Sequence, residues 1–417
     1  MASSPTGLDR LLAAKEIAIF CGPGGVGKTS VAAAAAAGAA ARLGGKVLVV
    51  TVDPARRLAD ALGVAGLGNR EREVPAKRLV AAGLQPFRGH PEPRALQGHP
   101  EPRARGGLWA AMLDTKQSWD DLVLRHAPDE ETAYRILENR LYDNITARFV
   151  QSHDYIAMER LHEIHRSGVY DLIVVDTPPS RNAIDFIEAP RRMAEFFGSP
   201  LLKWLTMPYR LGGRRGARMV TLASRPFYRV ADRILGSQFL EDIAEFFLNF
   251  QSMYEGFVER ARAVERLLRD RRTTFVVIST LEPAPVREAE FFVSALAERR
   301  LHLGALVLNK TLPDYLLGTS GEAVARALCR DPEGAARALV PGSGGPSRKS
   351  LDPATVSRVL HTVGESFLNF SVVAKREAEL RAELAAVPDL VLSVPYFEAD
   401  VHDLTGLARM GDHLFGS

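Results

Sequence analysis

The sequence predicts an α/β fold in which a doubly wound, mainly parallel sheet carries an inserted helical subdomain. Six apolar runs support the sheet, and each is dense in Val, Ile or Leu without polar alternation, as in strands covered on both faces. Segments typical of helices separate these runs, which favours parallel strands with helices on both faces of the sheet. The six runs are Glu16–Cys21, Lys46–Thr51, Asp171–Asp176, Thr273–Ser279, Leu303–Asn309 and Asp389–Val394.

We expect residues 1–417 to form one domain whose two long connections, 54–170 and 181–272, are largely helical insertions. In the second connection, apolar residues recur at spacings of three and four from Phe239 to Leu268, as on one face of an amphipathic helix. Residues 83–107, which repeat the heptapeptide GHPEPRA, and residues 341–350, rich in Gly, Pro and Ser, are predicted to be flexible loops.

The composition narrows the class of protein. Hydrophobic residues make up 46% and charged residues 25% of the chain, which is typical of a folded soluble protein. The net charge of +3 gives no support to nucleic-acid binding. The two cysteines, Cys21 and Cys329, form no CxxC pair, so neither a disulfide framework nor a thiolate metal site is expected. No apolar run reaches 18 residues, so we expect no transmembrane helix and a cytoplasmic location.

A phosphate-binding motif is the strongest signal in the sequence. Residues 22–29, GPGGVGKT, fit the pattern G-x4-G-K-[ST] between the first apolar run and the Ala-rich segment Val31–Ala41. Glycines allow backbone N–H groups to surround a phosphate, and the start of a helix adds a favourable dipole. By this motif Lys28 bridges the β- and γ-phosphates and Thr29 coordinates Mg²⁺. The alternative is a chance match to a Gly-rich turn. The predicted nucleotide-binding residues are Gly22, Gly24, Gly25, Val26, Gly27, Lys28, Thr29 and Ser30.

Two carboxylates follow apolar runs. Asp176 ends the run LIVVD, where an acid would hold Mg²⁺ directly or through water, and Asp53 ends the run VLVVTVD. Both fall at the carboxyl ends of predicted strands, the edge at which open α/β sheets bind ligands. Either aspartate could instead cap the next helix, and Pro54 suits such a cap at Asp53.

Three segments resemble the P-loop, switch I and switch II of the ArsA-like ATPases: GGVGKT at 24–29, DPARRLAD at 53–60 and DTPPS at 176–180. The segment that begins LIVVDTPPSRN is similar to a bacterial, actinobacterial-type branch of anion-transporting ATPases. The resemblance implies an ATPase that uses ATP and Mg²⁺, with Asp53 polarising the attacking water and Thr177 to Ser180 sensing the γ-phosphate. It also implies that Asn309 and Pro395 flank the adenine, although Asn309 could be an ordinary strand-end residue.

The sequence departs from the family pattern in two places. Pro23 stands where these ATPases usually carry a second, signature lysine, and Arg56 or Arg57 could supply a replacement charge. The metalloid-binding cysteine cluster and the zinc-binding CxxC pair of relatives have no counterpart, which disfavours arsenite transport. His162 and His165 could suggest a metal, but two polar residues on an exposed helix are the favoured interpretation.

A basic, aromatic segment suggests a partner. Between Leu201 and Phe239 there are eight basic residues and one acidic residue, with aromatic and aliphatic side chains between them. This pattern suits an anionic membrane surface or an apolar client, bound through residues 201–268, and it also suits a solvated face of a packed subdomain.

We therefore expect a Mg-dependent ATPase in which nucleotide-driven changes of a dimer control a helical surface for a protein or membrane partner. The dimer is a homodimer or a heterodimer with a paralogue, and contact with the membrane would be peripheral. The alternatives are the energising subunit of an anion transporter and an ATP-binding regulatory module with little hydrolysis.

Overall fold

The computed structural model describes most of the chain. The described residues are 7–52, 57–85, 107–139, 142, 150–178, 183–197, 246, 253–339, 352–384 and 390–416. The sequence-predicted loops at 83–107 and 341–350, and the basic segment at 201–239, lie almost entirely outside these residues.

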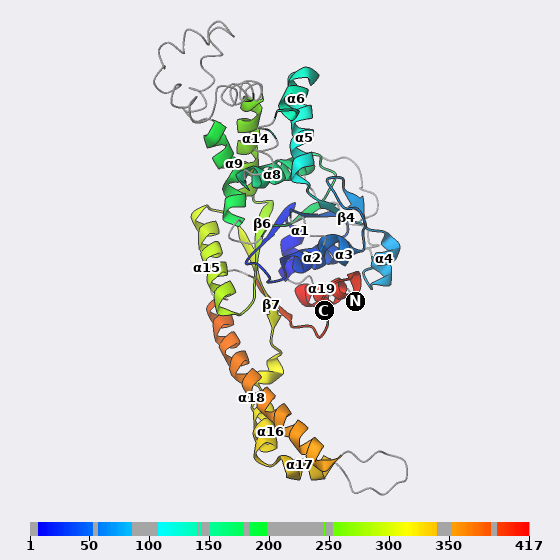
Figure 1. Ribbon diagram of the computed structural model, residues 1–417, viewed down its shortest axis with the longest axis vertical. Helices are drawn as coiled ribbons and strands as arrows, with labels where there is room; N and C mark the ends of the chain where they lie inside the picture. Colours follow the sequence, from blue (N-terminus) through cyan, green and yellow to red (C-terminus); the bar gives the residue numbers. More distant parts are fainter. Residues whose placement is uncertain are drawn as a thin grey trace.

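An eight-stranded sheet forms the centre of the molecule (Figure 1). The strand order is β3-β4-β2-β5-β1-β6-β7-β8, and every neighbouring pair is parallel except β3 and β4. The strands are β1 Ile17–Cys21, β2 Lys46–Thr51, β3 Arg72–Glu73, β4 Gly107–Met112, β5 Leu172–Asp176, β6 Thr273–Ser279, β7 Leu303–Thr311 and β8 Val391–Pro395. All six predicted strands are confirmed: β1, β2, β5, β6 and β7 are mostly buried between two helical layers, and β8 at the edge of the sheet is partly buried.

The two remaining strands lie within residues 54–170, which we expected to be a largely helical insertion, and the sequence-based interpretation did not include them. β4 lies inside that segment, pairs in parallel with β2 and begins at Gly107, a residue that we assigned to a loop. Its sequence, GLWAAM, has no β-branched residue, so its β-propensity is low. The long parallel pairing with β2 outweighs this propensity, and the sheet therefore extends into the first connection.

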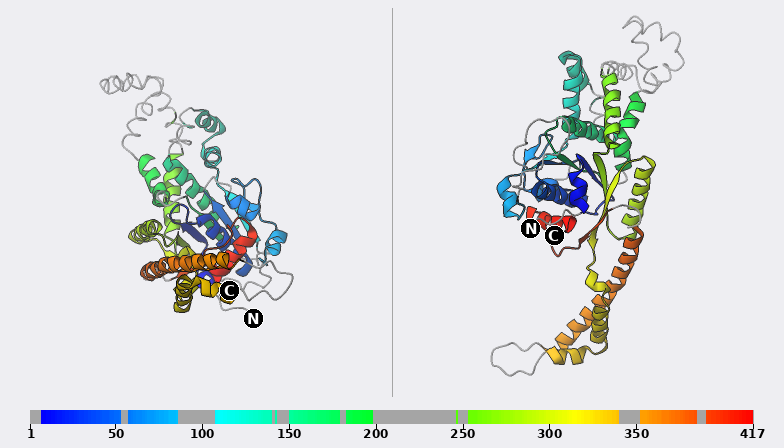
Figure 2. Two further views of the ribbon diagram at one scale, coloured as in Figure 1. Left: turned by 60° about the horizontal axis from the view of Figure 1, so that its bottom comes forward. Right: turned by 180° about the vertical axis from the view of Figure 1, so that it is seen from behind.

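Helices cover both faces of the sheet, as expected for a doubly wound fold (Figures 1 and 2). One buried apolar cluster lies between one face and five helices, and a second cluster lies between the other face and three helices and also includes Leu384. The first group is α1 Gly7–Ala13, α2 Lys28–Arg42, α3 Arg57–Leu62, α4 Ala76–Ala81 and α19 Leu404–Phe415; the second is α8 Val150–Arg166, α14 Tyr254–Leu268 and α15 Pro283–Glu298.

A smaller helical cluster extends from one end of the sheet (Figure 1). It adds α5 Thr115–His126, α6 Glu130–Leu137 and α9 Ala183–Phe197 to parts of α8 and α14. Its centre is aromatic: the rings of Trp119 and Phe257 stack with centroids 5.9 Å apart, and Tyr155 lies 5.7 Å from Phe257. Within α14, the apolar face predicted from the sequence is buried at Phe257, Ala261, Val264 and Leu268.

An arm of three helices projects from the opposite end of the sheet, as Figures 1 and 2 show. It follows β7 and the short 3-10 helix η1 Asp314–Leu317, and it consists of α16 Thr319–Arg330, α17 Pro332–Leu339 and α18 Pro353–Leu384. α16 and α17 pack along α18, which has 32 residues. Sequence analysis did not predict this arm. Within the described residues, no helix combines the length and the apolar character needed to cross a lipid bilayer.

Candidate nucleotide site

The phosphate-binding motif forms a tight loop between β1 and α2. Gly22 has φ 152°, and a Cβ atom there would lie 2.0 Å from the carbonyl oxygen of Ile278 in β6. Gly27 has φ 90°, and a Cβ atom there would lie 2.4 Å from the Asn309 amide nitrogen. A residue with a side chain would therefore strain the backbone and collide with a neighbouring strand at both positions. The loop can lie this close to β6 and β7 only because it is glycine-rich.

The first turn of α2 adjoins this loop and has no side-chain cap. The N-cap residue, Gly27, has no side chain that could cap the helix, and the first turn contains no acidic residue. The first N–H groups of a helix have no intrahelical partners, and they attract anions together with the helix dipole. Thr29 and Ser30 lie in this turn and are partly exposed. The start of α2 is therefore built to accept a phosphate.

Lys28 is buried at the start of α2, with 8% of its surface exposed. Its ammonium group donates a hydrogen bond of 2.8 Å to the carbonyl oxygen of Pro23, within the same loop. Pro23 stands in the place of the signature lysine. Its backbone carbonyl oxygen thus accepts a hydrogen bond from the charged ammonium group of Lys28. Binding of a phosphate would offer Lys28 a charged acceptor in exchange for a neutral one, and charge-assisted hydrogen bonds are stronger.

Asp176 lies next to the loop at the carboxyl end of β5. It is fully buried, and it pairs in register with Phe20 of β1 and with Thr51 of β2. The hydroxyl group of Thr51 donates a hydrogen bond of 3.0 Å to the Asp176 carboxylate. Thr177, the next residue, donates from its hydroxyl to the carbonyl oxygen of Phe20 at 2.9 Å. The predicted acid is therefore held two residues from the start of the phosphate loop on the neighbouring strand.

Asp53, the predicted catalytic acid, lies outside the described residues, as do Arg56 and Ser180. The chain that leads to Asp53 is described: the Val52 N–H donates 3.3 Å to the carbonyl oxygen of Asp176. Val52, the last described residue before Asp53, is therefore joined to Asp176. Arg57, the other candidate for a replacement charge, is the exposed first residue of α3.

Asn309 approaches the loop from the other side of β1, and Pro395 lies on the strand beyond it. Asn309 in β7 is 4% exposed, and its amide donates 2.7 Å to the carbonyl oxygen of Val26. Pro395 ends β8 and pairs with Thr311, two residues beyond Asn309. Asn309 is therefore a residue that holds the phosphate loop in place, a role that its strand-end position alone did not reveal. The predicted contact of both residues with adenine remains a prediction.

Two threonines at this edge were missed by sequence analysis. Thr51 holds Asp176, and the only sequence signal was its place at the end of an apolar run. Thr280 follows β6 and is 6% exposed, and its hydroxyl has no hydrogen-bond partner in the part of the chain that the structure describes. A buried hydroxyl of this kind usually has a partner. Hydroxyl residues at the end of a buried strand, or directly after it, are thus candidate site residues that a motif search overlooks.

The helical cluster contains a different group of potential metal ligands. His126, Glu159 and Glu163 place one ligand atom each within 4.8 Å of one another. However, Glu159 forms an ion pair with Arg260, and Glu163 forms one with Arg160 at 3.1 Å. Burial lowers the pKa of His126 and raises the pKa of Glu159. Carboxylates that are already neutralised by arginines do not attract a cation, so this group is best explained as a buried ion-pair network.

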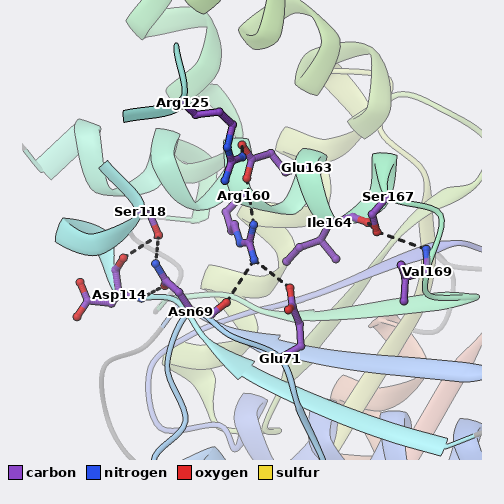
Figure 3. Close-up of polar contacts among 10 residues, drawn as sticks. All are labelled: Asn69, Glu71, Asp114, Ser118, Arg125, Arg160, Glu163, Ile164, Ser167 and Val169. Atoms are coloured by element: carbon purple, nitrogen blue, oxygen red, sulfur yellow. Dashed lines mark hydrogen bonds and ion pairs between the residues drawn. The ribbon is translucent and has the colours of Figure 1, made fainter. Parts of the chain in front are cut away.

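Figure 3 shows how this network fastens a loop to two helices. Arg160 of α8 donates to Glu71 at 3.0 Å and to the carbonyl oxygen of Asn69 at 3.3 Å. Asn69 in turn donates 2.9 Å to Ser118 of α5 and accepts 2.6 Å from the Asp114 N–H. These contacts join a loop, α5 and α8, which indicates a structural role.

The two histidines singled out in the sequence are partly buried on α8 rather than exposed. His165 contacts Glu16 at 2.7 Å, and burial lowers the pKa of His162.

The residues of the loop fit a nucleoside triphosphate with Mg²⁺. The space around Gly25 is open, Lys28 supplies positive charge, and the start of α2 supplies N–H groups. Thr29 and Asp176 would hold the Mg²⁺ ion, which would offset charge on the phosphates. The fold and the loop together define the class of the protein, an α/β P-loop NTPase.

Comparison with known proteins places the chain within this class. A family model described as "Anion-transporting ATPase" matches residues 15–319, so the chain belongs to the ArsA ATPase family. An uncharacterized protein of Streptomyces coelicolor is 28% identical over 301 residues, which cover 71% of this chain and 62% of that protein. A protein of Aquifex aeolicus, whose name describes it as an arsenical pump-driving ATPase, is 24% identical over 304 residues. That match covers 72% of this chain and 64% of the relative, so the chain spans less than two thirds of the length of either relative.

Proposed function

We propose that the protein binds Mg-ATP in the loop between β1 and α2 and hydrolyses it. The observation that carries the proposal is the convergence of the buried Lys28, the uncapped start of α2 and the buried pair Thr51–Asp176 at one edge of the sheet. Membership of the ArsA ATPase family supports the same reaction. Lys28 and the N–H groups would bind the phosphates, while Thr51 would keep the Asp176 carboxylate in place.

We further propose that the ATP cycle controls a partner surface through a dimer. Val52, before the first switch segment, donates a hydrogen bond to Asp176, and Thr177, in the second, donates one to Phe20 of β1. Binding of nucleotide in the loop would therefore change the conformation at the start of each switch segment. Residues 201–268 remain the proposed surface for a protein or membrane partner, and the second protomer would be an identical chain or a paralogue.

A second candidate is an ATP-binding module with little hydrolysis. It is favoured by Pro23, which stands in the place of the signature lysine, so that the loop carries one lysine instead of two. That lysine, Lys28, donates a hydrogen bond to the Pro23 carbonyl oxygen. We do not propose arsenite as a substrate of this chain, although the name of the Aquifex relative describes an arsenical pump-driving ATPase. Of the two cysteines, Cys21 is buried in β1 and Cys329 lies in the arm, and two cysteines cannot form a site of three thiolates.

The test is phosphate release with Mg-ATP, measured per chain over a wide range of protein concentrations. The Lys28→Ala variant is the blank, and Lys77→Ala, which removes an exposed lysine of α4, is the matched control. We expect turnover in the parent and in the control that is lost in Lys28→Ala, and turnover that rises with concentration if a dimer is required. Tight ATP binding without phosphate release would favour the second candidate, and absence of ATP binding would refute both.

A further inference from the structure

The arm formed by η1, α16, α17 and α18 lies almost wholly outside the family match, which ends at residue 319, where α16 begins. It projects away from the sheet (Figures 1 and 2). Its base is tied to the sheet, because the Leu312 N–H donates 3.0 Å to the carboxylate of Glu377 in α18. The arm is therefore an addition to the common fold, and its surface is a candidate for a function of its own.

One side of α18 is occupied by α16. A Cβ atom on Gly364 would lie 2.7 Å from the Ala325 carbonyl oxygen and 2.8 Å from the Cys329 sulfur, and one on Gly321 would lie 2.5 Å from the Phe367 ring. Glycines at both contacts allow the two helices to approach closely. This packing fixes which side of α18 faces outward.

A stripe of large apolar side chains lies beside this contact and faces solvent. Val359, Val363, Phe370 and Val373 are 55%, 51%, 53% and 48% exposed, and we call them the α18 stripe. Their spacings of four, seven and three residues place them within about 80° of the circumference of an α-helix. Soluble proteins rarely leave a contiguous apolar surface of this kind exposed, and such surfaces mark interaction sites.

Val324 of α16, which is 59% exposed, extends the stripe. Lys375 of α18 pairs with Glu322 of α16 at 3.0 Å on one side of the helix pair. Given about 100° of rotation per residue, Val324 and the α18 stripe both lie on the opposite side. The apolar surface therefore spans both helices of the arm.

The charge around the stripe limits what it can bind. Apart from His361, residues 353–374 contain one basic residue, Arg358, and one acidic residue, Glu365. Anionic membranes and nucleic acids are bound through clusters of Lys and Arg, which this segment lacks. A charged peptide would likewise find no complementary surface. A contact between two identical copies needs no charge complementarity, and no net charge opposes it here.

We propose that the α18 stripe binds the α18 stripe of a second copy of this chain in antiparallel orientation. In the register that covers the stripe best, Val359 faces Phe370 of the partner subunit and Val363 faces Ser366 of the partner subunit. Val356, a partly buried residue of the same row, then faces Val373 of the partner subunit. These positions alternate at spacings of three and four, as in the contact row of a coiled coil.

The antiparallel register suits the side-chain sizes. A parallel, in-register pair would stack Phe370 on itself and Ser366 on itself, whereas the antiparallel pair sets Phe370 against the smaller Val359 and Val363 against the smaller Ser366. A patch of this kind exposes a few hundred Å², so two facing patches would bury roughly 800 Å² of apolar surface. With polar flanks this reaches the lower end of specific interfaces, so the dimer is weak and concentration-dependent. The contact does not depend on the proposed ATP hydrolysis.

The first experiment is sedimentation velocity of the full chain over a wide range of concentrations, with EDTA and without nucleotide. The parent is expected to shift from monomer to dimer as its concentration rises, and Phe370→Lys is expected to weaken this association at least tenfold. The matched control is Val372→Lys, because Val372 is 68% exposed on the same helix but lies about 100° away from the stripe. It should associate like the parent.

The second experiment tests the register in a Cys329→Ala background. Val359→Cys protein mixed with Phe370→Cys protein should form a disulfide-linked pair upon mild oxidation, while either protein alone should form few. In the antiparallel dimer like positions lie 11 residues apart, about 16 Å along the helix, which is too far for a disulfide.

Several results would overturn the proposal. A parent that stays monomeric at all concentrations excludes the dimer. If the Phe370→Cys thiol in such a monomer resists a thiol-modifying reagent, another part of the chain covers the α18 stripe. Equal association of Phe370→Lys and the parent, or a dimer that requires Mg-ATP, assigns the contact to a different surface. Cross-linking of Val359→Cys with itself at the same efficiency as the mixture refutes the antiparallel register.

Discussion

At the scale of single residues, the candidate site depends on small groups that hold larger ones. Thr51 holds the Asp176 carboxylate, Asn309 holds the Val26 carbonyl, and Gly27 makes room for Asn309. Each of these contacts joins residues that are far apart in the sequence. A change at Thr51 or Asn309 should alter the site without removing a group that is predicted to contact phosphate directly, whereas a change at Gly27 alters the phosphate loop itself.

Thr51→Val keeps the shape of the side chain and removes the hydrogen bond to Asp176. A buried carboxylate that loses a donor is destabilised, so we expect the free energy of unfolding to fall by about 1–3 kcal/mol. Mg-ATP affinity should fall as well, because Asp176 loses its orientation. Chemical denaturation and ATP titration check both effects. Thr51→Ser retains the hydroxyl and should stay close to the parent; an unaffected Thr51→Val would show that the hydrogen bond is dispensable.

Gly27→Ala should disrupt the phosphate loop. The backbone at Gly27 has φ 90°, and the added methyl group would meet the Asn309 amide, so the loop must shift or Asn309 must release Val26. We expect at least a tenfold loss of ATP affinity, measured by equilibrium titration. Gly68→Ala is the control, since a Cβ atom there meets nothing within 4 Å. Equal ATP affinity in both variants would contradict a rigid loop.

At the scale of elements, the turn between α14 and β6 is held by charge. Hydrogen bonds from Arg272 lower the pKa of Asp270 to about 2. Because the folded pKa lies below the ordinary value of 3.8, the stability from this carboxylate is present above pH 4 and is lost as the pH falls toward 2. The side chain is 31% exposed, and solvent screening limits the effect to about 1 kcal/mol.

Asp270→Asn should therefore be less stable than the parent at pH 6, and the difference should shrink as the pH falls from 4 to 2. Thermal unfolding of both proteins across this range checks the prediction. A difference that is constant with pH would show that the contact does not depend on the charge of Asp270.

In the arm, Gly364 allows α16 and α18 to pack closely against each other. Gly364→Val would force the branched side chain against the Ala325 carbonyl and the Cys329 sulfur, so α16 should separate from α18. We expect faster proteolysis within residues 319–384, while ATP binding at the distant loop is retained. Limited proteolysis followed by mass spectrometry identifies the cleaved sites. The control is Glu365→Val, a substitution at an exposed position of α18. Equal proteolysis of both variants would argue against close packing in the arm.

At the scale of the whole molecule, ligand binding should be visible in global stability. If the loop binds Mg-ATP, ATP at a hundred times its dissociation constant should raise the free energy of unfolding by about 2.7 kcal/mol. Denaturation with and without Mg-ATP measures this, and Lys28→Ala should show no such increase. An equal increase in Lys28→Ala would place the bound nucleotide elsewhere.

Local patterns in the sequence were sufficient for the six predicted strands, the phosphate loop and the helix that follows it. These features depend on neighbours along the chain: continuous apolar runs require burial on both faces, and glycines permit a loop that other residues would strain. The same information placed Asp176 at the carboxyl end of its strand, since that position follows from where the apolar run ends. It also indicated the ArsA family, which the family match confirmed.

The order of strands in the sheet was decided only by the tertiary structure. That order brings Asn309 to Val26 across 283 residues of sequence and Thr51 to Asp176 across 125, and it recruits β4 despite its low β-propensity. The side of α18 that faces solvent likewise depends on where α16 packs. Such contacts depend on the free energy of the whole assembly of strands and helices, because pairing and burial between distant segments outweigh local preference.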